Sequence, residues 1–401
     1  MVIRVGEFRI GTEEKEVINE ILESGRISEG ERVREFEKLF SEYVGTKCTV
    51  AVNSGTSALI AGLEAVKNKF AVKTKAKIIT TPVTYVATSN AILLTGFEPV
   101  YVDIDKETFC ITPENIKAQL ENIDTSNYAL IIPVHLMGYP CDMDEINKIA
   151  KNYGLLVFED SAQAHGTLYK GKKTGSLSLL AAFSFYIAHN IQAGELGAVT
   201  TNDFEIGRLV KKIKANGRSC DCPVCQRSEG KCPKLSNGTI DDFDPRFTHE
   251  IVGYNFKTME FQAALATVQL KKADWIKSRR SQNVQYLNQE LERFSDLLQL
   301  PKYDDCISYM AYPLIIKRPE RISRRKLRAQ LERLGVETRP LFGCIPTQQP
   351  AYAHFSAKYK NKLPTAEFVG QNGFYIGCHQ YLTSSDLDYI VKCFSETLRG
   401  H

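Results

Sequence analysis

Residues 184–199 read Ser-Phe-Tyr-Ile-Ala-His-Asn-Ile-Gln-Ala-Gly-Glu-Leu-Gly-Ala-Val, with a polar centre between two apolar runs. The runs predict strands at Ala182–Tyr186 and Ala198–Thr201, joined by a loop that carries His189. Histidine titrates near neutral pH and can move protons. A lone loop histidine is more often an ordinary polar residue, so the motifs around it decide its meaning.

Strands and helices alternate through the first two-thirds of the chain. Four more strands are predicted, at Lys77–Thr81, Pro99–Asp103, Ala129–Val134 and Leu155–Glu159. Helices such as Ser57–Lys67 and Met143–Lys151 lie between them. Such alternation predicts an α/β fold with a mostly parallel sheet that is covered on both faces.

The C-terminal third is expected to form a smaller α+β domain. A long polar helix is predicted at about Thr258–Phe294, because this stretch contains no glycine or proline. Strands at Tyr309–Ile316 and Phe374–Gly377 and helices at Arg325–Leu334 and Ser385–Leu398 follow. We therefore expect a large domain at 1–270 and a small one at 271–401.

Composition excludes several classes of protein. The chain has 401 residues, of which 43% are hydrophobic and 24% charged, as in ordinary globular proteins. A net charge of +4 gives no indication of a nucleic-acid partner. No apolar run is long enough to span a membrane, and the N-terminus has no apolar signal core. We expect a cytoplasmic protein.

Two further motifs are candidate ligand sites. Asn53–Leu59 follows an apolar stretch and opens a helix, whose free N–H groups can bind phosphate. Glu159–Gly166 follows a predicted strand, and ligands of open α/β sheets bind at the carboxyl ends of strands. Taken alone, the first motif is more often an ordinary helix cap, and the second more often a solvated loop.

Five segments together resemble the motifs of the DegT/DnrJ/EryC1/StrS sugar aminotransferase family, in order and approximate spacing. They are Asn53–Leu59, Thr81–Thr88, Glu159–Gly166, Ser184–Val199 and Gly253–Phe256. The resemblance implies an aspartate-aminotransferase-like fold, the fold type I of pyridoxal phosphate enzymes. It also implies a homodimer whose active sites lie at the subunit interface.

The resemblance assigns roles to individual residues. Asp160 is expected to bind the pyridine nitrogen of the cofactor, Gln163 the ring hydroxyl, and Tyr85 the ring face. A carboxylate at the pyridine nitrogen keeps the ring an electron sink. The phosphate would be held by Gly55, Thr56 and Ser184, and by Asn255 of the other subunit.

His189 occupies the position where most members of the family have the lysine that holds the cofactor covalently. Histidine keeps the ability to transfer protons but loses the covalent link. This resembles the nucleotide-sugar 3-dehydratases of the family, which use noncovalent pyridoxamine phosphate and a nucleotide-linked 4-keto-6-deoxyhexose. His189 would be the catalytic base. An ordinary sugar aminotransferase and a catalytically inactive paralogue are the alternatives.

Two details of these motifs leave questions open. His165 either contacts the cofactor or is a loop histidine without a catalytic role. Leu196 stands where the family's turn usually has glycine, so the geometry of this turn is not predicted.

Four of the eleven cysteines lie within 13 residues, at Cys220, Cys222, Cys225 and Cys232. They fall in an irregular segment, about 216–253, that we expect to be an insertion. Four thiolates suit tetrahedral zinc or an iron–sulfur cluster. One branch of the 3-dehydratases carries a [2Fe–2S] cluster that passes electrons from a reductase. That branch has a cysteine where Ala162 stands, which leaves zinc as the alternative.

The identity of the metal would decide how the reaction ends. With an iron–sulfur cluster, a partner reductase supplies electrons to the deoxygenated sugar. Without one, a glutamate-driven cycle regenerates pyridoxamine phosphate, and the 3-deoxy sugar is released by hydrolysis.

Overall fold

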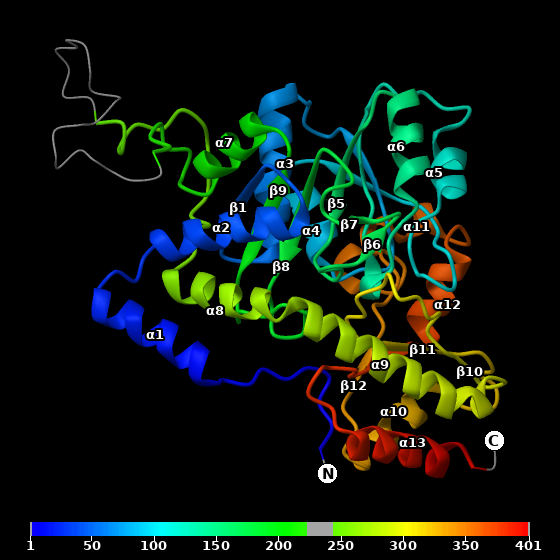
Figure 1. The fold of residues 1–401 in the computed structure, drawn as a ribbon. Helices are drawn as coiled ribbons and strands as arrows, with labels where there is room; N and C mark the ends of the chain where they lie inside the picture. The colour runs from blue at the N-terminus through cyan, green and yellow to red at the C-terminus, as the bar shows by residue number, and fades with distance from the viewer. Residues whose placement is uncertain (1, 223–243, 400–401) are drawn as a thin grey trace.

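A computed structural model of the chain describes residues 2–222 and 244–399. A central seven-stranded sheet has the order β1-β9-β8-β5-β4-β2-β3 (Figure 1). Its strands are β1 (Cys48–Val52), β2 (Lys77–Thr80), β3 (Glu98–Tyr101), β4 (Tyr128–Ile132), β5 (Leu156–Asp160), β8 (Leu180–Ser184) and β9 (Gly197–Thr201). Only β9 runs antiparallel to its neighbours in this sheet. The predicted α/β fold with a mostly parallel sheet is confirmed.

Helices cover both faces of this sheet. They are α1 (Thr12–Ser24), α2 (Glu31–Val44), α3 (Gly55–Phe70), α4 (Ala87–Leu94), α5 (Pro113–Leu120), α6 (Met143–Asn152) and α7 (Phe204–Ile213). Alternate residues of β4 show the two faces: Leu130 packs in one cluster with Leu59 of α3, and Ile131 packs in another with Ile146 of α6. Burial on both sides explains why these strands read as continuous apolar runs.

A second, four-stranded sheet forms from the C-terminal part, with the order β10-β11-β13-β12. Its strands are β10 (Leu298–Gln299), β11 (Tyr312–Ile316), β12 (Thr338–Pro340) and β13 (Gly373–Ile376). Helices α10 (Arg324–Arg333), α11 (Ala353–Tyr359), α12 (Pro364–Asn372) and α13 (Ser384–Leu398) accompany it. The N-terminal Ile3 bridges to Val336 in this unit, so the first residues join the C-terminal sheet rather than the central one.

Several short elements complete the described structure. The pair β6 (Leu168–Tyr169) and β7 (Lys172–Lys173) forms a small hairpin. Single 3-10 turns lie at η1 (Leu136–Gly138), η3 (Glu292–Phe294) and η4 (Pro350–Tyr352).

The long helix predicted at Thr258–Phe294 is wrong in one respect: it is two helices. Helix α8 (Glu260–Lys271) ends at Lys272, and α9 (Ala273–Leu291) begins beyond it. The ammonium of Lys272 is held by Glu13 and Glu14, at 2.7 and 2.8 Å. The break therefore coincides with tertiary contacts to α1, which helix propensity does not encode.

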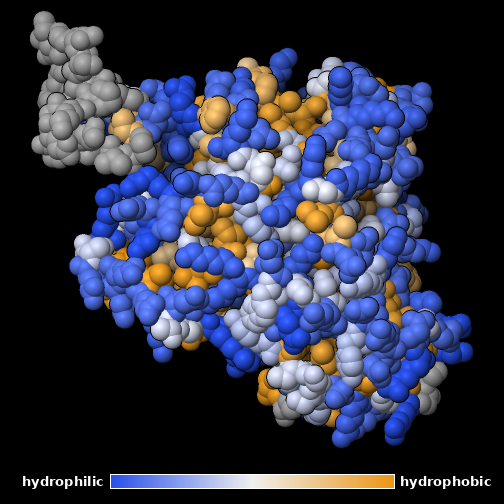
Figure 2. All heavy atoms as spheres, in the orientation of Figure 1, coloured by the Kyte–Doolittle hydropathy of each residue, from blue (hydrophilic) through white to orange (hydrophobic). Residues whose placement is uncertain are grey.

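The outer surface in Figure 2 is mostly hydrophilic, with apolar patches interrupted by charged side chains. Among residues 2–222 and 244–399, no helix has both the length and the apolar character needed to cross a membrane.

Candidate active site

The predicted site residues gather at the carboxyl ends of the central strands. Asp160 ends β5 and pairs with Ala182 of the parallel strand β8, which itself ends at Ser184. Ser184 pairs with Gly197, the first residue of β9. On the other side of β9, Gly197 pairs with Val52 at the end of β1. Strand order therefore brings three separate motifs, Asn53–Leu59, Glu159–Gly166 and Ser184–Val199, to one edge.

Asp160 is buried and held at both oxygens. Its Oδ2 accepts a hydrogen bond from Thr88 Oγ1 at 2.8 Å, and its Oδ1 accepts one from the Ala162 N–H at 3.2 Å. Burial raises the pKa of Asp160, while these two hydrogen bonds oppose the rise. No cation of the described residues forms an ion pair with this carboxyl group, so it is available to a positively charged ligand.

The neighbouring carboxylate, Glu159, has a structural role. It accepts hydrogen bonds from the Gly175 and Leu177 N–H groups at 2.7 and 2.9 Å, and it contacts His135 at 3.0 Å. The two acids of this motif thus point to different partners. Glu159 holds the chain around β8, and Asp160 faces the site.

Helix α3 begins at the same edge. Ser54 caps it by accepting a hydrogen bond from the Ser57 N–H at 3.1 Å, and Gly55 opens the first turn. A Cβ on Gly55 would lie 2.5 Å from the Cβ of Ser184, and one on Gly197 would lie 2.1 Å from the Ser54 carbonyl oxygen. Glycine at both points lets α3 begin directly beside Ser184. Thr56 lies in this first turn, half-buried.

Gln163 and Tyr85 differ in how firmly they are held. Gln163 is buried and accepts a hydrogen bond from the Met137 N–H through Oε1 at 2.9 Å, which fixes its amide. Tyr85 is 61% exposed, and its ring lies 6.2 Å from that of Phe342. The structure places Gln163 firmly and leaves the Tyr85 ring accessible.

His189 lies in a tight loop between β8 and β9. Its N–H donates to the Tyr186 carbonyl at 2.9 Å, and the loop closes where the Ala193 N–H donates to the Phe185 carbonyl at 2.8 Å. The Nδ1 atom of His189 is buried and has no hydrogen-bond partner in the described part of the chain. Burial and the charge of Arg280 lower its pKa to about 4, although a hydrogen bond with the Ser184 backbone opposes this.

Leu196, which stands where the family's turn usually has glycine, is a core residue. Its side chain is fully buried in a cluster with Phe36 and Phe185. The side chain at this position of the turn therefore packs in the hydrophobic core. Gly197, the next residue, is the glycine that the close approach to Ser54 requires.

His165 is a buried neighbour of His189. Its ring lies 5.0 Å from Phe185 and 5.3 Å from Phe183, and 6.3 Å from the ring of His189. Burial lowers its pKa well below the ordinary value, and the nearby His189 adds to the effect. The imidazole is therefore neutral at pH 7 and packs against aromatic rings.

Asn255 lies close to the start of α3 in its own chain. It is exposed, it bridges to Ala215, and the next carbonyl, of Phe256, accepts the Asn53 N–H at 2.9 Å. A role in the site of another subunit stays a prediction.

Two of the four clustered cysteines lie in the described part. Cys220 and Cys222 are half-buried. Cys225 and Cys232 lie outside the described residues. Within ranges 2–222 and 244–399, no three metal-binding side chains come together.

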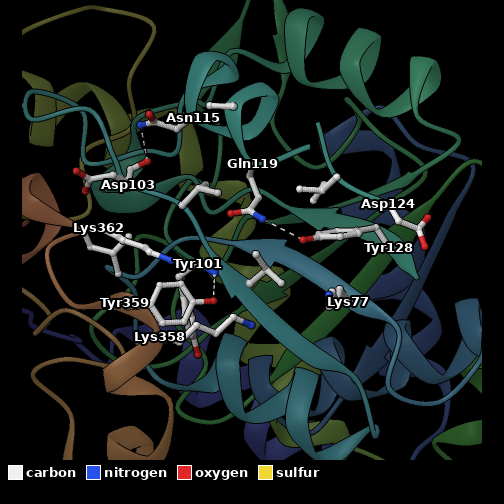
Figure 3. Close-up of a pocket in the computed structure, with 15 residues that line it drawn as sticks. Lys77, Tyr101, Asp103, Asn115, Gln119, Asp124, Tyr128, Lys358, Tyr359 and Lys362 are labelled. Carbon is white, nitrogen blue, oxygen red and sulfur yellow. Dashed lines mark hydrogen bonds between the residues drawn. The ribbon is translucent and has the colours of Figure 1, made fainter. Parts of the chain in front are cut away.

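A cavity of about 480 Å³ lies elsewhere, beside the edge strand β3 (Figure 3). Its polar wall includes Lys77, Lys362, Tyr128 and Tyr359. None of the predicted site residues lines it.

Sequence reasoning missed some residues that shape the site. Thr88 lies within the quoted motif Thr81–Thr88, but no role was assigned to it, although its hydroxyl holds Asp160. Arg280 gave no signal, because an arginine in a polar helix is typical of a solvated face. Its hydrogen-bond partners lie 29 to 100 residues away in the chain.

Comparison with known proteins identifies the family of the chain. A family model described as the DegT/DnrJ/EryC1/StrS aminotransferase family matches residues 9–395. The chain is 31% identical over 399 residues to GDP-perosamine synthase of Caulobacter vibrioides, covering 99% of this chain and 98% of that protein. It is 32% identical over 380 residues to dTDP-4-dehydro-2,6-dideoxy-D-glucose 3-dehydratase of Saccharopolyspora spinosa, covering 92% and 81%.

Solved structures share the same fold. The E. coli GDP-4-keto-6-deoxy-D-mannose-3-dehydratase with bound hydrated PLP has a TM-score of 0.84 and 26% identity, with 98% of this chain and 99% of that chain covered. The predicted aspartate-aminotransferase-like fold of type I is thereby confirmed.

Proposed function

Because the chain belongs to the DegT/DnrJ/EryC1/StrS aminotransferase family, we propose that it is a nucleotide-sugar 3-dehydratase. It removes the C3 hydroxyl of a nucleotide-linked 4-keto-6-deoxyhexose. Its cofactor is pyridoxamine phosphate, bound without a covalent link. The observation that carries this proposal is His189, which occupies the cofactor-lysine position of a motif that contains no lysine between Ser184 and Val199.

The residues present fit a pyridoxal-type cofactor. The capped start of α3, with Gly55 and Thr56 beside Ser184, offers N–H and hydroxyl donors to a phosphate. Asp160 is a buried carboxylate with no ion-pair partner among residues 2–222 and 244–399, as a pyridinium nitrogen requires. The amide of Gln163 would meet the ring hydroxyl, and Tyr85 would cover the ring.

When bound, pyridoxamine phosphate supplies an amine that condenses with the C4 keto group and a ring that withdraws electrons. Asp160 keeps that ring protonated through its negative charge. His189 serves as a proton carrier, because its Nδ1 has no protein partner in the described chain. A low pKa makes the protonated imidazole a strong acid, suited to protonating the departing C3 hydroxyl.

An aminotransferase is the second candidate, favoured by the similarity to GDP-perosamine synthase. That activity requires a lysine from elsewhere to reach the cofactor. Borohydride reduction of the enzyme loaded with pyridoxal phosphate, followed by peptide mass spectrometry, separates the two. We expect no lysine adduct, and a modified lysine would support the aminotransferase.

The His189→Asn variant tests the catalytic role. We expect it to bind pyridoxamine phosphate as the wild type does, measured by absorption. Exchange of the cofactor's C4′ hydrogen with deuterated water, in the presence of GDP-4-keto-6-deoxy-D-mannose, should be lost. Wild-type exchange in this variant would remove His189 from the reaction.

We further propose that Cys220, Cys222, Cys225 and Cys232 bind a [2Fe–2S] cluster, with zinc as the alternative. The support is the spacing of the four thiols within 13 residues. Iron would indicate a reductase partner, and zinc the glutamate-driven route. Metal analysis after anaerobic purification decides: we expect iron with visible absorption, lost in Cys220→Ser, and stoichiometric zinc would contradict the cluster.

A homodimer completes the proposed enzyme. Tyr85 is 61% exposed and Tyr186 is 40% exposed beside the site, and Val252 is 90% exposed near Asn255. The family resemblance implies that a partner subunit covers this side of the molecule. We also propose that the chain divides into two domains, at 1–270 and 271–401.

A further inference from the structure

One short segment connects the His189 loop with the cofactor-side residues. Residues 306–310, here called the strut, lie between η3 and β11. Asn190, the residue after His189, donates two hydrogen bonds to Ser308 of the strut: 2.6 Å to Oγ and 3.1 Å to the carbonyl oxygen. Both residues are almost fully buried, at 2% and 1% exposure.

This contact fixes the orientation of the amide. The Ser308 carbonyl can only accept hydrogen bonds, so the Asn190 side chain must present its NH₂ group there. Two bonds from one planar amide restrict rotation of the side chain, and they anchor the backbone immediately after His189. The other anchor of the loop is the bond from the His189 N–H to the Tyr186 carbonyl.

The strut is also tied to the residues around Gln163. The Met310 N–H donates to the Met137 carbonyl at 3.2 Å, and the Met137 N–H donates to Gln163 Oε1 at 2.9 Å. The Ser308 N–H donates to Thr167 Oγ1 at 2.9 Å. Gly138 lies so close that a Cβ there would be 2.3 Å from the Ser308 carbonyl oxygen.

A buried cation holds the strut from the opposite side. Arg280 of α9 is fully buried and donates to the carbonyls of Met310 and Tyr309, at 2.6 and 3.3 Å. Its Nε donates to Gln380 Oε1 at 3.1 Å. No carboxylate in the described ranges pairs with it. Burying a guanidinium without a counter-ion is costly, and here its bonds fix the strut.

We propose that Asn190 and Ser308 are positioning residues for His189, which lock its loop to the same strut that holds Gln163. This inference rests on the proposed function, because it treats His189 as the proton carrier. The buried strut therefore fixes the distance between His189 and Gln163. Neither residue is expected to contact the substrate.

The variants Asn190→Ala and Ser308→Ala test this. Ser308→Ala keeps the bond to the carbonyl, so its effect should be the smaller. We expect kcat and C4′ hydrogen exchange with GDP-4-keto-6-deoxy-D-mannose to fall by about 10- to 100-fold in Asn190→Ala, since misplacement by about 1 Å has effects of this size. The KM and the affinity for pyridoxamine phosphate should change by less than about threefold.

Asn283→Ala is the matched control. Asn283 is also a buried amide that donates two hydrogen bonds to backbone carbonyls, of Cys378 and His379 at 3.2 and 3.0 Å. It should lower the thermal stability by a similar amount and leave the exchange rate near that of the wild type. Equal loss of activity in Asn283→Ala and Asn190→Ala would overturn the inference.

A second readout does not depend on activity. In protein labelled with 15N-histidine, the His189 imidazole signal is identified by its absence in His189→Asn. We expect this signal to shift in Asn190→Ala and Ser308→Ala but not in Asn283→Ala. An unmoved signal in both strut variants contradicts positioning. Absence of exchange in the wild type, with the signal shifted as expected, would instead reject the proposed function and keep the structural link.

Discussion

Burial pushes the two central titratable residues in opposite directions. It lowers the pKa of His189 to about 4 and raises the pKa of Asp160, because each charged form loses water. A bound pyridinium would favour the charged form of Asp160 through ion pairing. His189 then remains the neutral group of the site, ready to accept a proton.

The low pKa of His189 predicts how the reaction depends on pH. His189 is neutral above its pKa of about 4, so kcat/KM should not fall from protonation of this residue between about pH 8 and about pH 5.5. Below that range the rate should fall as the imidazole takes up a proton. The measurement is a kcat/KM profile with buffers matched in ionic strength. A loss of activity centred near pH 6.5, the ordinary value for histidine, would contradict the buried environment.

At this scale, the sequence nominated site residues but not their surroundings. Asp160, Gln163, Ser184 and His189 are candidates because their motifs resemble a known family, and the structure brings these segments to one edge of the sheet. Thr88 and Arg280 were not among the candidates, since their roles depend on contacts between segments distant in the chain. The free Nδ1 of His189 is likewise a property of the folded interior.

Among the elements, the predicted strands and most predicted helices end within three residues of the observed limits. The run predicted at Lys77–Thr81 is observed as β2 (Lys77–Thr80), because buried parallel strands must be apolar on both faces. The break between α8 and α9 at Lys272 could not be predicted, because it coincides with contacts to Glu13 and Glu14 far away in sequence.

Helix α3 offers a test of the phosphate site. In Gly55→Ala, the new Cβ would lie 2.5 Å from the Ser184 Cβ, so the start of α3 must move away from β8. We expect the affinity for pyridoxamine phosphate to fall by about tenfold or more, as for the loss of one or two hydrogen bonds to a charged group. Absorption titration measures it.

Gly62→Ala provides the comparison on the same helix. Its Cβ would lie 2.4 Å from Phe158 Cζ, in the core rather than at the site. This variant should lose thermal stability but retain cofactor affinity. If both variants lose cofactor affinity equally, general destabilisation explains the effect. The proposed phosphate site at Gly55 would then be wrong.

For the whole molecule, the proposed homodimer predicts that two subunits contribute to each site. Asn255 was predicted from family resemblance to act in the other subunit, while in its own chain it lies beside the start of α3. Sequence cannot distinguish these arrangements, because they differ only in which copy contributes the side chain.

Mixing two inactive variants distinguishes them. We expect His189→Asn and Asn255→Ala to be impaired separately and to regain activity when unfolded together and refolded. Half of the dimers would be hybrids with one intact site each, which gives roughly a quarter of the wild-type rate. No recovery, with dimers confirmed by light scattering, would place Asn255 in the site of its own chain.

The most direct test of dehydration is mass spectrometry of the sugar product. The wild-type enzyme is incubated anaerobically with pyridoxamine phosphate and either GDP-4-keto-6-deoxy-D-mannose or its dTDP-linked glucose counterpart, once with glutamate and once with a one-electron donor such as reduced methyl viologen. With His189 as an untethered base, the product should lack the C3 oxygen and carry a keto oxygen at C4, which water supplies when the C4–nitrogen bond is hydrolysed. A product that retains the C3 oxygen and carries an amine at C4 would contradict dehydration and identify an aminotransferase.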